Sequence, residues 1–351
     1  MTIGAEGRAE GQGTKAPLAV RLALVITELD PGTFSMPTRT ARPSQITLGL
    51  LWLIDGALQS QPYMFGKSFV TTVLLPNRLG QPSFIGSPIG WIAHLIEPHV
   101  ALFNTFAATI EVLIGVGLLY RRTVRAALAI SFVWATGIWF AGEGLGMLFT
   151  GTASPLTGAP GAALLYVLAG LMCWPRKAAT RGAPNSPAPG LLGDRTARLA
   201  YSAIWLGSAV LWLLPANSGS AAVHDAIAHA PSGADWLSAT LDAVSTATAG
   251  RGTTIAIALA IVSATIGLAV INGRHSHAFL VLAISLAVAY WIVGQGLGGV
   301  LTGQATDVGS APAMILIASI LIAGPARPRT PVRLRAPEQP RSTSGLVHRS
   351  G

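Results

Sequence analysis

The sequence predicts an all-α membrane protein, a polytopic bundle of about eight transmembrane helices arranged as two parallel repeats of four. Three observations predict it. Hydrophobic residues make up 51% of the chain and charged residues only 11%, against about 25% charged in a soluble domain. Apolar runs of the length of a bilayer crossing recur between charged loops. A stretch of the first half also reappears in the second half.

The basic residues lie mainly on every second loop between the apolar runs. Twenty of the 23 Lys and Arg residues lie on alternate loops and at the two ends of the chain, and only Lys67, Arg78 and Arg251 lie on the other loops. Because cytoplasmic loops carry the excess of Lys and Arg, we expect a multi-pass protein of the plasma (cell) membrane with both termini in the cytoplasm. The net charge of +9 then reflects orientation in the lipid bilayer, with no nucleic-acid partner.

Composition divides the chain into five segments. We expect a flexible leader at 1–44, in which Met36 is a candidate translation start, and a Pro- and Arg-rich cytoplasmic linker at 176–197. The two four-helix repeats occupy 45–175 and 198–324, and a disordered basic tail follows at 325–351. A short outer helix is expected at Ile89–Ile96. The expected spans are Gln45–Ser60, His99–Tyr120, Arg125–Phe149, Gly158–Trp174, Leu199–Leu214, Arg251–Ile271, His277–Leu301 and Gly309–Ile322.

The repeat is visible as a self-match at an offset of 152 residues. Trp139–Ala153 and Trp291–Ala305 share eight identities in fifteen positions. The match extends without a gap to Ala159-Pro160 and Ala311-Pro312. Because each unit has an even number of spans, the two copies have the same orientation and are related by an axis along the membrane normal.

Small and polar residues recur in this repeated stretch. Glycines spaced four apart let neighbouring helices approach in lipid, and an extra glycine with a Thr-Gly pair allows the end of the span to unwind and turn. We expect tight packing with a re-entrant turn; the alternative is a ligand or ion site on the freed backbone. The residues are Gly142, Gly144, Gly146, Thr150, Gly151, Gly294, Gly296, Gly298, Thr302 and Gly303.

Acidic residues inside the expected spans are the first candidates for function. Asp55, Glu111 and Glu143 lie in spans of the first half, where an ionisable group is costly and therefore a functional candidate by default. The second half has Gln295 in place of Glu143 and serines in place of the other two acids. The alternative is that the three acids are neutral hydrogen-bonded contacts between helices.

A second candidate group lies in the first outer segment. His94 and Glu97 share one helical face, and His99 follows Pro98. This group would bind a metal, accept a proton from a quinol or bond a quinone oxygen; the alternative is that its members are polar anchors at the membrane interface. No metal site and no catalytic residue is assigned. Soluble catalytic motifs such as HExxH and GxSxG are absent from the sequence, and Cys173 is the only cysteine, so no CxxC pair exists.

The first repeat resembles the DoxX/DoxD-like family of membrane proteins. The resemblance rests on Leu48–Gly56 in the first span, the long outer segment, and a Glu-containing second span that ends in Gly115–Arg122. It covers about residues 45–175 and, more faintly, 198–324. The family consists of small four-helix proteins, of which one branch is a subunit of a thiosulfate:quinone oxidoreductase and another a partner in membrane oxidoreductase assemblies.

The resemblance implies the membrane subunit or scaffold of a redox or quinone-linked system, with quinone as the candidate cofactor and other membrane or redox proteins as partners. Asp55, His94, Glu97, Glu111 and Glu143 would then line one site in the outer half. Two alternatives remain open. One is a transporter or channel for a small solute or proton that uses the same acids. The other is a noncatalytic partner that assembles other membrane proteins.

Overall fold

The computed structural model describes residues 41–175, 190–272 and 276–323. All regular secondary structure in these ranges is helical. The expected leader up to residue 40, most of the linker and the basic tail lie outside the described residues. The linker expected at 176–197 is shorter than predicted at its end, because a helix already begins at Gly193.

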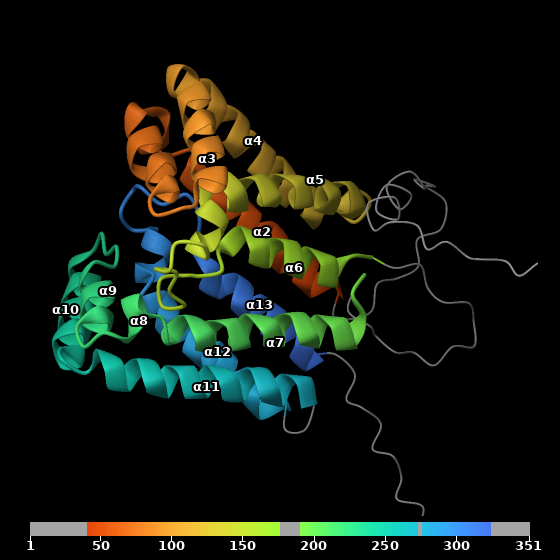
Figure 1. The fold of residues 1–351 in the computed structure, drawn as a ribbon. Helices are drawn as coiled ribbons and strands as arrows, with labels where there is room; N and C mark the ends of the chain where they lie inside the picture. Colours follow the sequence, from red (N-terminus) through yellow and green to blue (C-terminus); the bar gives the residue numbers. More distant parts are fainter. Residues whose placement is uncertain (1–40, 176–189, 273–275, 324–351) are drawn as a thin grey trace, which may run out of the picture.

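Eight of the helices form one bundle (Figure 1). They follow the order of the eight expected spans, and their bounds differ by a few residues except at the ends of α5 and α12, which come well before the expected residues. These helices are α2 (Ala41–Gln59), α4 (Val100–Leu119), α5 (Val124–Gly137), α6 (Ala162–Cys173), α7 (Gly193–Trp212), α11 (Gly252–Asn272), α12 (Ser276–Val293) and α13 (Ser310–Ala323).

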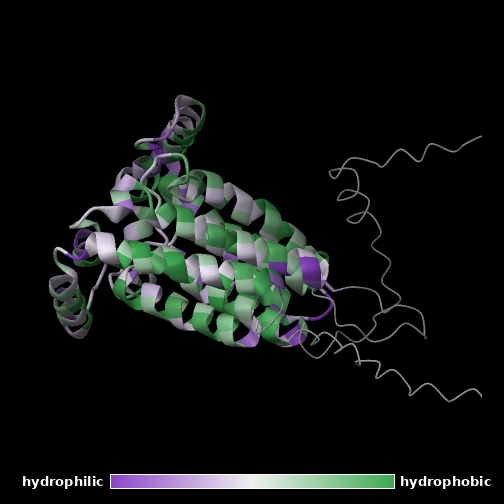
Figure 2. Cartoon of the chain, turned by 60° about the horizontal axis from the view of Figure 1, so that its bottom comes forward, coloured by the Kyte–Doolittle hydropathy of each residue, from purple (hydrophilic) through white to green (hydrophobic). Residues whose placement is uncertain are grey.

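In the part of the chain that the structure describes, four helical segments are long and apolar enough to cross a membrane: Ser83–Leu119, Val124–Gly142, Gly252–Asn272 and Ser276–Val293. Helices α6 and α13 are apolar but shorter. Helices α2 and α7 are 19 and 20 residues long and carry more polar side chains. Large apolar side chains on the outside of the bundle remain exposed, among them Leu102, Val133 and Ile261. Figure 2 shows that hydrophobic residues predominate along the bundle helices. Such a surface is stable in lipid.

The remaining helices lie at one end of the bundle. Between α7 and α11 the structure has three helices that the sequence did not predict. The outer helix expected at Ile89–Ile96 begins earlier, at Ser83, because Pro88 lies inside the helix and does not end it. These elements are η1 (Pro62–Phe65), η2 (Phe69–Leu74), η3 (Leu75–Arg78), α3 (Ser83–Ile96), η4 (Glu97–His99), α8 (Pro215–Ser218), α9 (Ala222–Ala228) and α10 (Asp235–Thr248).

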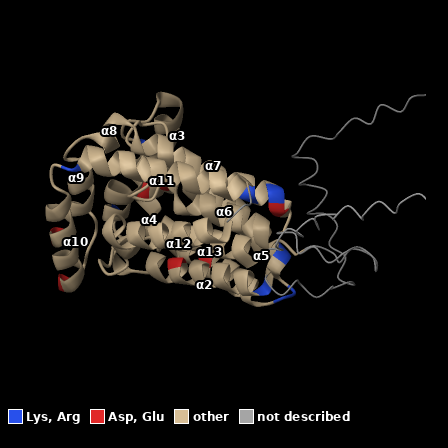
Figure 3. Cartoon of the chain, turned by 90° about the horizontal axis from the view of Figure 1, so that it is seen from below, with Lys and Arg blue, Asp and Glu red and all other residues tan. Residues whose placement is uncertain are grey.

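Most described Lys and Arg residues gather at the other end (Figure 3). Three of them bond carbonyl groups at or near the ends of other helices. Arg42 donates to the Leu118 carbonyl over 2.9 Å, Arg198 to the Leu321 carbonyl over 3.2 Å and Arg125 to the Pro175 carbonyl over 3.5 Å. A cation is favourable there, because the last carbonyl groups of a helix have no partner inside it and carry partial negative charge.

Glycines set the closest helix contacts, and they do so in both halves. Helix α2 packs against α4, and α7 packs against α11. A Cβ atom added at Gly115 would lie 2.8 Å from the Gly49 carbonyl oxygen, and one at Gly267 would lie 3.1 Å from the Ser202 carbonyl oxygen. Small residues at these points allow the two backbones to approach, which is the main source of helix association in lipid.

Gly115→Ala tests this contact. The added methyl group overlaps the α2 backbone, so we expect the variant to lose about 1–3 kcal/mol of stability and to melt at a lower temperature in detergent or nanodiscs. Gly137→Ala is the matched control, because nothing lies within 4 Å of the Cβ position at Gly137. Equal melting temperatures for the two variants would show that the α2–α4 contact is not limited by backbone approach.

Candidate functional site

Each repeated glycine stretch forms a tight left-handed turn at the end of its helix. Leu145 and Gly146 have φ angles of 57° and 63°, and Leu297 and Gly298 have φ angles of 58° and 71°. A Cβ atom at Gly146 would lie 2.1 Å from the Pro160 carbonyl oxygen, so the turn is in contact with the loop that follows it. Helix α5 continues as η5 (Ile138–Gly142) and ends there, short of the expected Phe149. Likewise, α12 ends at Val293 instead of Leu301.

In each turn, one polar residue between two glycines caps the next helix: Glu143 in the first half and Gln295 in the second. The Ala163 N–H donates to Glu143 Oε1 over 3.0 Å, and the Ser310 N–H donates to Gln295 Oε1 over 3.0 Å. The first N–H groups of a helix have no partner inside it, and a side-chain oxygen satisfies them. Both turns therefore fix the start of a short apolar helix, α6 in the first half and α13 in the second.

Hydrogen bonds after the turns show that the alignment of the two halves expected from the sequence is wrong in this region. The Trp139 indole donates to the Pro160 carbonyl and the Trp291 indole to the Val308 carbonyl, each over 2.8 Å. Pro160 and Val308 are 148 residues apart, whereas the two tryptophans are 152 apart. The second loop is therefore four residues shorter, and the ungapped match of Ala159-Pro160 with Ala311-Pro312 does not describe equivalent positions in space.

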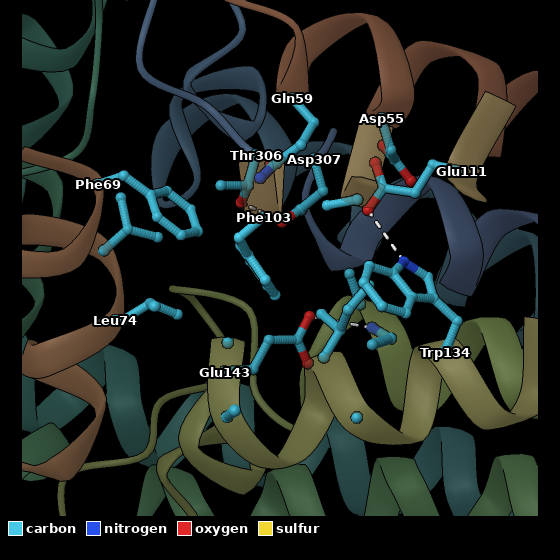
Figure 4. A pocket seen from close by; sticks show the side chains of 18 of the residues that line it. Asp55, Gln59, Phe69, Leu74, Phe103, Glu111, Trp134, Glu143, Thr306 and Asp307 are labelled. Carbon is cyan, nitrogen blue, oxygen red and sulfur yellow. Dashed lines mark hydrogen bonds between the residues drawn. The ribbon is translucent and has the colours of Figure 1, made fainter. Parts of the chain in front are cut away.

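A cavity of about 270 Å³ lies inside the first half of the bundle. It is bounded by α2, α4, α5, α6, the outer segments η2 and α3, and the loop before α13. Most of the wall is apolar, with Phe69, Phe103 and Trp134 among its side chains. Four carboxyl groups reach it, those of Asp55, Glu111, Glu143 and Asp307. Figure 4 shows Asp55 and Glu111 side by side, with Glu143 on the opposite wall.

Backbone and indole N–H groups hold each carboxyl group in place. The Trp134 indole donates to Glu111 Oε1 over 3.2 Å, and the Val308 N–H donates to Asp55 Oδ1 over 3.3 Å. The Gly309 N–H donates to Asp307 Oδ1 over 2.7 Å. The second oxygens of Glu111 and Glu143 are buried without a hydrogen-bond partner. These two oxygens are free to bond a ligand.

The wall of the cavity contains acidic side chains but no basic ones. No Lys or Arg is among the residues that line it, and Asp55 and Glu111 are only 3% and 5% exposed. Several unpaired negative charges in such surroundings are very costly. The acids are therefore either protonated or neutralised by a ligand. At Asp307, which lies in a loop outside the helices, burial raises the pKa, while hydrogen bonds from the Gly309 N–H and the Thr306 hydroxyl oppose the shift.

The structure brings together three of the residues predicted for the site and separates the others. Asp55, Glu111 and Glu143 line the cavity. In contrast, His94, Glu97 and His99 lie at the end of α3 and in η4, outside its wall. His94 Nδ1 is 3.7 Å from Glu97 Oε2, and their side chains are 73% and 43% exposed. Within the described residues, no group of three or more His, Cys, Asp and Glu is arranged to hold a metal ion.

Sequence reasoning missed several polar residues of this cavity, among them Gln59 and Thr306, and most notably Asp307 and Tyr166. Asp307 reaches it from the loop before α13, in the second half of the chain, and Tyr166 reaches it from α6, where its ring packs edge-on against Trp52. Asp307 carried a usable signal, because it is the one acidic residue between α12 and α13. Tyr166 carried none, since a tyrosine in an apolar span is commonly explained by packing.

A much smaller cavity, of about 20 Å³, lies in the second half. Its wall contains Trp205, Ser208, Gln295 and Met314. The first three correspond through the repeat to Trp52, Asp55 and Glu143. Met314 corresponds to Tyr166 through the offset of 148 residues. The second half therefore has the same wall positions without carboxyl groups and almost without space.

Comparison with protein-family models, with curated proteins and with solved structures gives no match for this chain. The proposals below therefore rest on the residues and on the geometry.

Gln295→Ala tests the cap of α13. The substitution leaves the N–H groups of Ser310 and Ala311 without their acceptor, so we expect a loss of about 1–2 kcal/mol and a lower melting temperature. Gln295→Glu keeps the acceptor oxygen and is the matched control, with a melting temperature near that of the wild type. Equal destabilisation by both substitutions would contradict the capping role.

Proposed function

We propose that the chain is a DoxX-like protein of the plasma membrane with eight transmembrane helices in two tandem repeats. Matching features of the two halves support this proposal. Helix α2 packs on α4 as α7 packs on α11, and α5 packs on α6 as α12 packs on α13. Each half has a left-handed turn followed by a capped helix. With the arginine-rich end in the cytoplasm, both termini are cytoplasmic.

We propose further that the four-carboxyl cavity binds the ring of a quinone, and that the chain is the membrane subunit of a redox system. The observation that carries this proposal is a mainly apolar cavity that contains four carboxyl groups and no Lys or Arg, two of the carboxyls having a buried oxygen without a hydrogen-bond partner. A quinone ring is apolar and flat, and its two carbonyl groups accept hydrogen bonds. Protonated carboxyl groups such as those of Glu111 and Glu143 are suitable donors.

The same groups suit the proton chemistry of the ligand. Reduction of a quinone to a quinol takes up two electrons and two protons. In this proposal a partner protein with a redox centre supplies the electrons, since the described residues of this chain offer no such centre. The cavity carboxyls supply the protons, one each to the two quinone oxygens, and are then reprotonated from water. Four acids in one cavity provide more than the two protons required.

Quinone binding is measurable in the purified chain. Trp52 and Trp134 line the cavity, so a short-chain quinone bound there quenches their fluorescence in nanodiscs. Glu111→Leu removes a hydrogen-bond donor, and we expect about tenfold weaker binding, equivalent to ~1.4 kcal/mol. Glu111→Gln retains an N–H donor and is expected to bind nearly as the wild type does.

Ser263→Ala is the matched control for this measurement. Ser263 occupies the position of Glu111 in the second half and is buried, but it does not line the cavity. We expect wild-type affinity and one quinone per chain. Quenching that does not saturate, or the same affinity in Glu111→Leu as in the wild type, would reject the quinone site.

One observation favours a second candidate, a transporter of small organic cations. Aromatic faces combined with acids and without Lys or Arg are also the pattern that binds quaternary ammonium groups. In proteoliposomes, uptake of a tetraalkylammonium ion that Asp55→Asn or Glu143→Gln abolishes would support transport. If neither quinone nor ammonium ion binds and pull-downs recover a constant partner, the chain has the role of an assembly protein.

A further inference from the structure

A second, more polar cavity lies between the two halves at the end of the bundle opposite the arginines. Its volume is about 540 Å³, enough for many water molecules at about 30 Å³ each. The loop before α6, the end of α9 and the turn at Gly294–Gly298 form its wall. Thr152, Thr157 and His229 belong to this wall and are exposed, so the cavity opens to solvent there. We call it the vestibule.

The vestibule and the carboxyl cavity share part of one wall. Glu143, Ala162 and Asp307 line both of them. One oxygen of Glu143 is buried without a hydrogen-bond partner. Gly161 makes room for this carboxyl group, because a Cβ atom there would lie 2.1 Å from Glu143 Oε2. Two acids therefore stand between a polar space and an apolar one.

We propose that the vestibule is a water-filled path by which protons reach the carboxyl cavity, and that Glu143 and Asp307 are the residues where protons pass between them. This inference deepens the proposed function, because a cavity that protonates a quinone must recover its protons from an aqueous phase. The titratable groups along the path are His229 at the rim, Glu143 and Asp307 at the shared wall, and Asp55, Glu111 and Tyr166 inside.

The different polarity of the two cavity walls indicates the side from which protons enter. The inner cavity is mainly apolar, with Phe69, Leu74 and Phe103 in its wall, so it offers water few polar partners. The vestibule has backbone carbonyls of glycine-rich loops and the hydroxyls of Ser154 and Thr157 in its wall. Water is stable where several polar partners surround it and unstable in an apolar cavity. Protons therefore arrive from the vestibule side.

Carboxyl labelling of the full chain in nanodiscs tests the path. A water-soluble carbodiimide adds to a protonated carboxyl to form an O-acylisourea, and an added amine such as glycine ethyl ester displaces the urea to leave an amide. We expect mass spectrometry to find this amide at Glu143 and not at Glu111. A lipophilic carbodiimide, which enters from the bilayer, is expected to label Glu111 as well.

Thr157→Trp supplies the decisive variant. The exposed Thr157 lies at the mouth of the vestibule, so the indole obstructs it, and we expect labelling of Glu143 by the water-soluble reagent to fall several-fold. Thr136→Trp is the matched control, because Thr136 is exposed on α5 and lines neither cavity; its labelling stays at the wild-type level. Melting temperatures verify that both variants fold.

Two results would overturn the aqueous path: labelling of Glu143 no faster than that of Glu111, or labelling of Glu143 unchanged by Thr157→Trp. Neither measurement involves a quinone. A failed quinone titration with this labelling pattern intact therefore rejects the proposed ligand and keeps the path, whereas a positive titration with the pattern absent keeps the ligand and rejects the path.

Discussion

The structure depends on acidic groups held in apolar surroundings without a cation beside them. A carboxylate in such a place is strongly disfavoured, and even a protonated carboxyl needs hydrogen bonds to be stable there. The chain supplies one set of bonds to each acid, from the Trp134 indole to Glu111 and from backbone N–H groups to Asp55, Glu143 and Asp307. Glu111 and Glu143 each keep one buried oxygen without a hydrogen-bond partner, and in the proposed function a bound ligand supplies that partner.

The two glycine turns make this arrangement possible. A helix that continued to Phe149 would carry Glu143 away from the start of α6, whereas the left-handed turn after it places the carboxyl group against the N–H of Ala163. The second turn places the side-chain oxygen of Gln295 against the N–H of Ser310 and so fixes the end of the loop that contains Asp307 and Val308. The Val308 N–H reaches Asp55 from 253 residues away in sequence. The cavity is therefore completed only when both halves are present in one chain.

The sequence predicted those parts of the fold that lipid imposes directly. Charge-free runs and alternate basic loops indicated the order of the eight bundle helices, and the rule that acids in spans are functional selected Asp55, Glu111 and Glu143. It failed where tertiary packing decides. Asp307 was missed because its loop joins the site only through contact between the halves. His94 was assigned to the site because its outer segment was expected to lie next to the outer half of the spans that carry the acids. In the structure, α3 places His94 outside the wall of the cavity.

The two halves differ at the positions that line the cavities. Ser208, Gln295 and Met314 occupy the places of Asp55, Glu143 and Tyr166, and the space between them shrinks from about 270 to about 20 Å³. Gln295 provides the acceptor oxygen that caps α13, so both halves have the cap and only the first half has a carboxyl group there. Capping alone needs only a neutral oxygen, as Gln295 shows in the second half. In the proposed function the carboxyl group of Glu143 adds proton exchange to capping, because it lines both the polar vestibule and the apolar cavity.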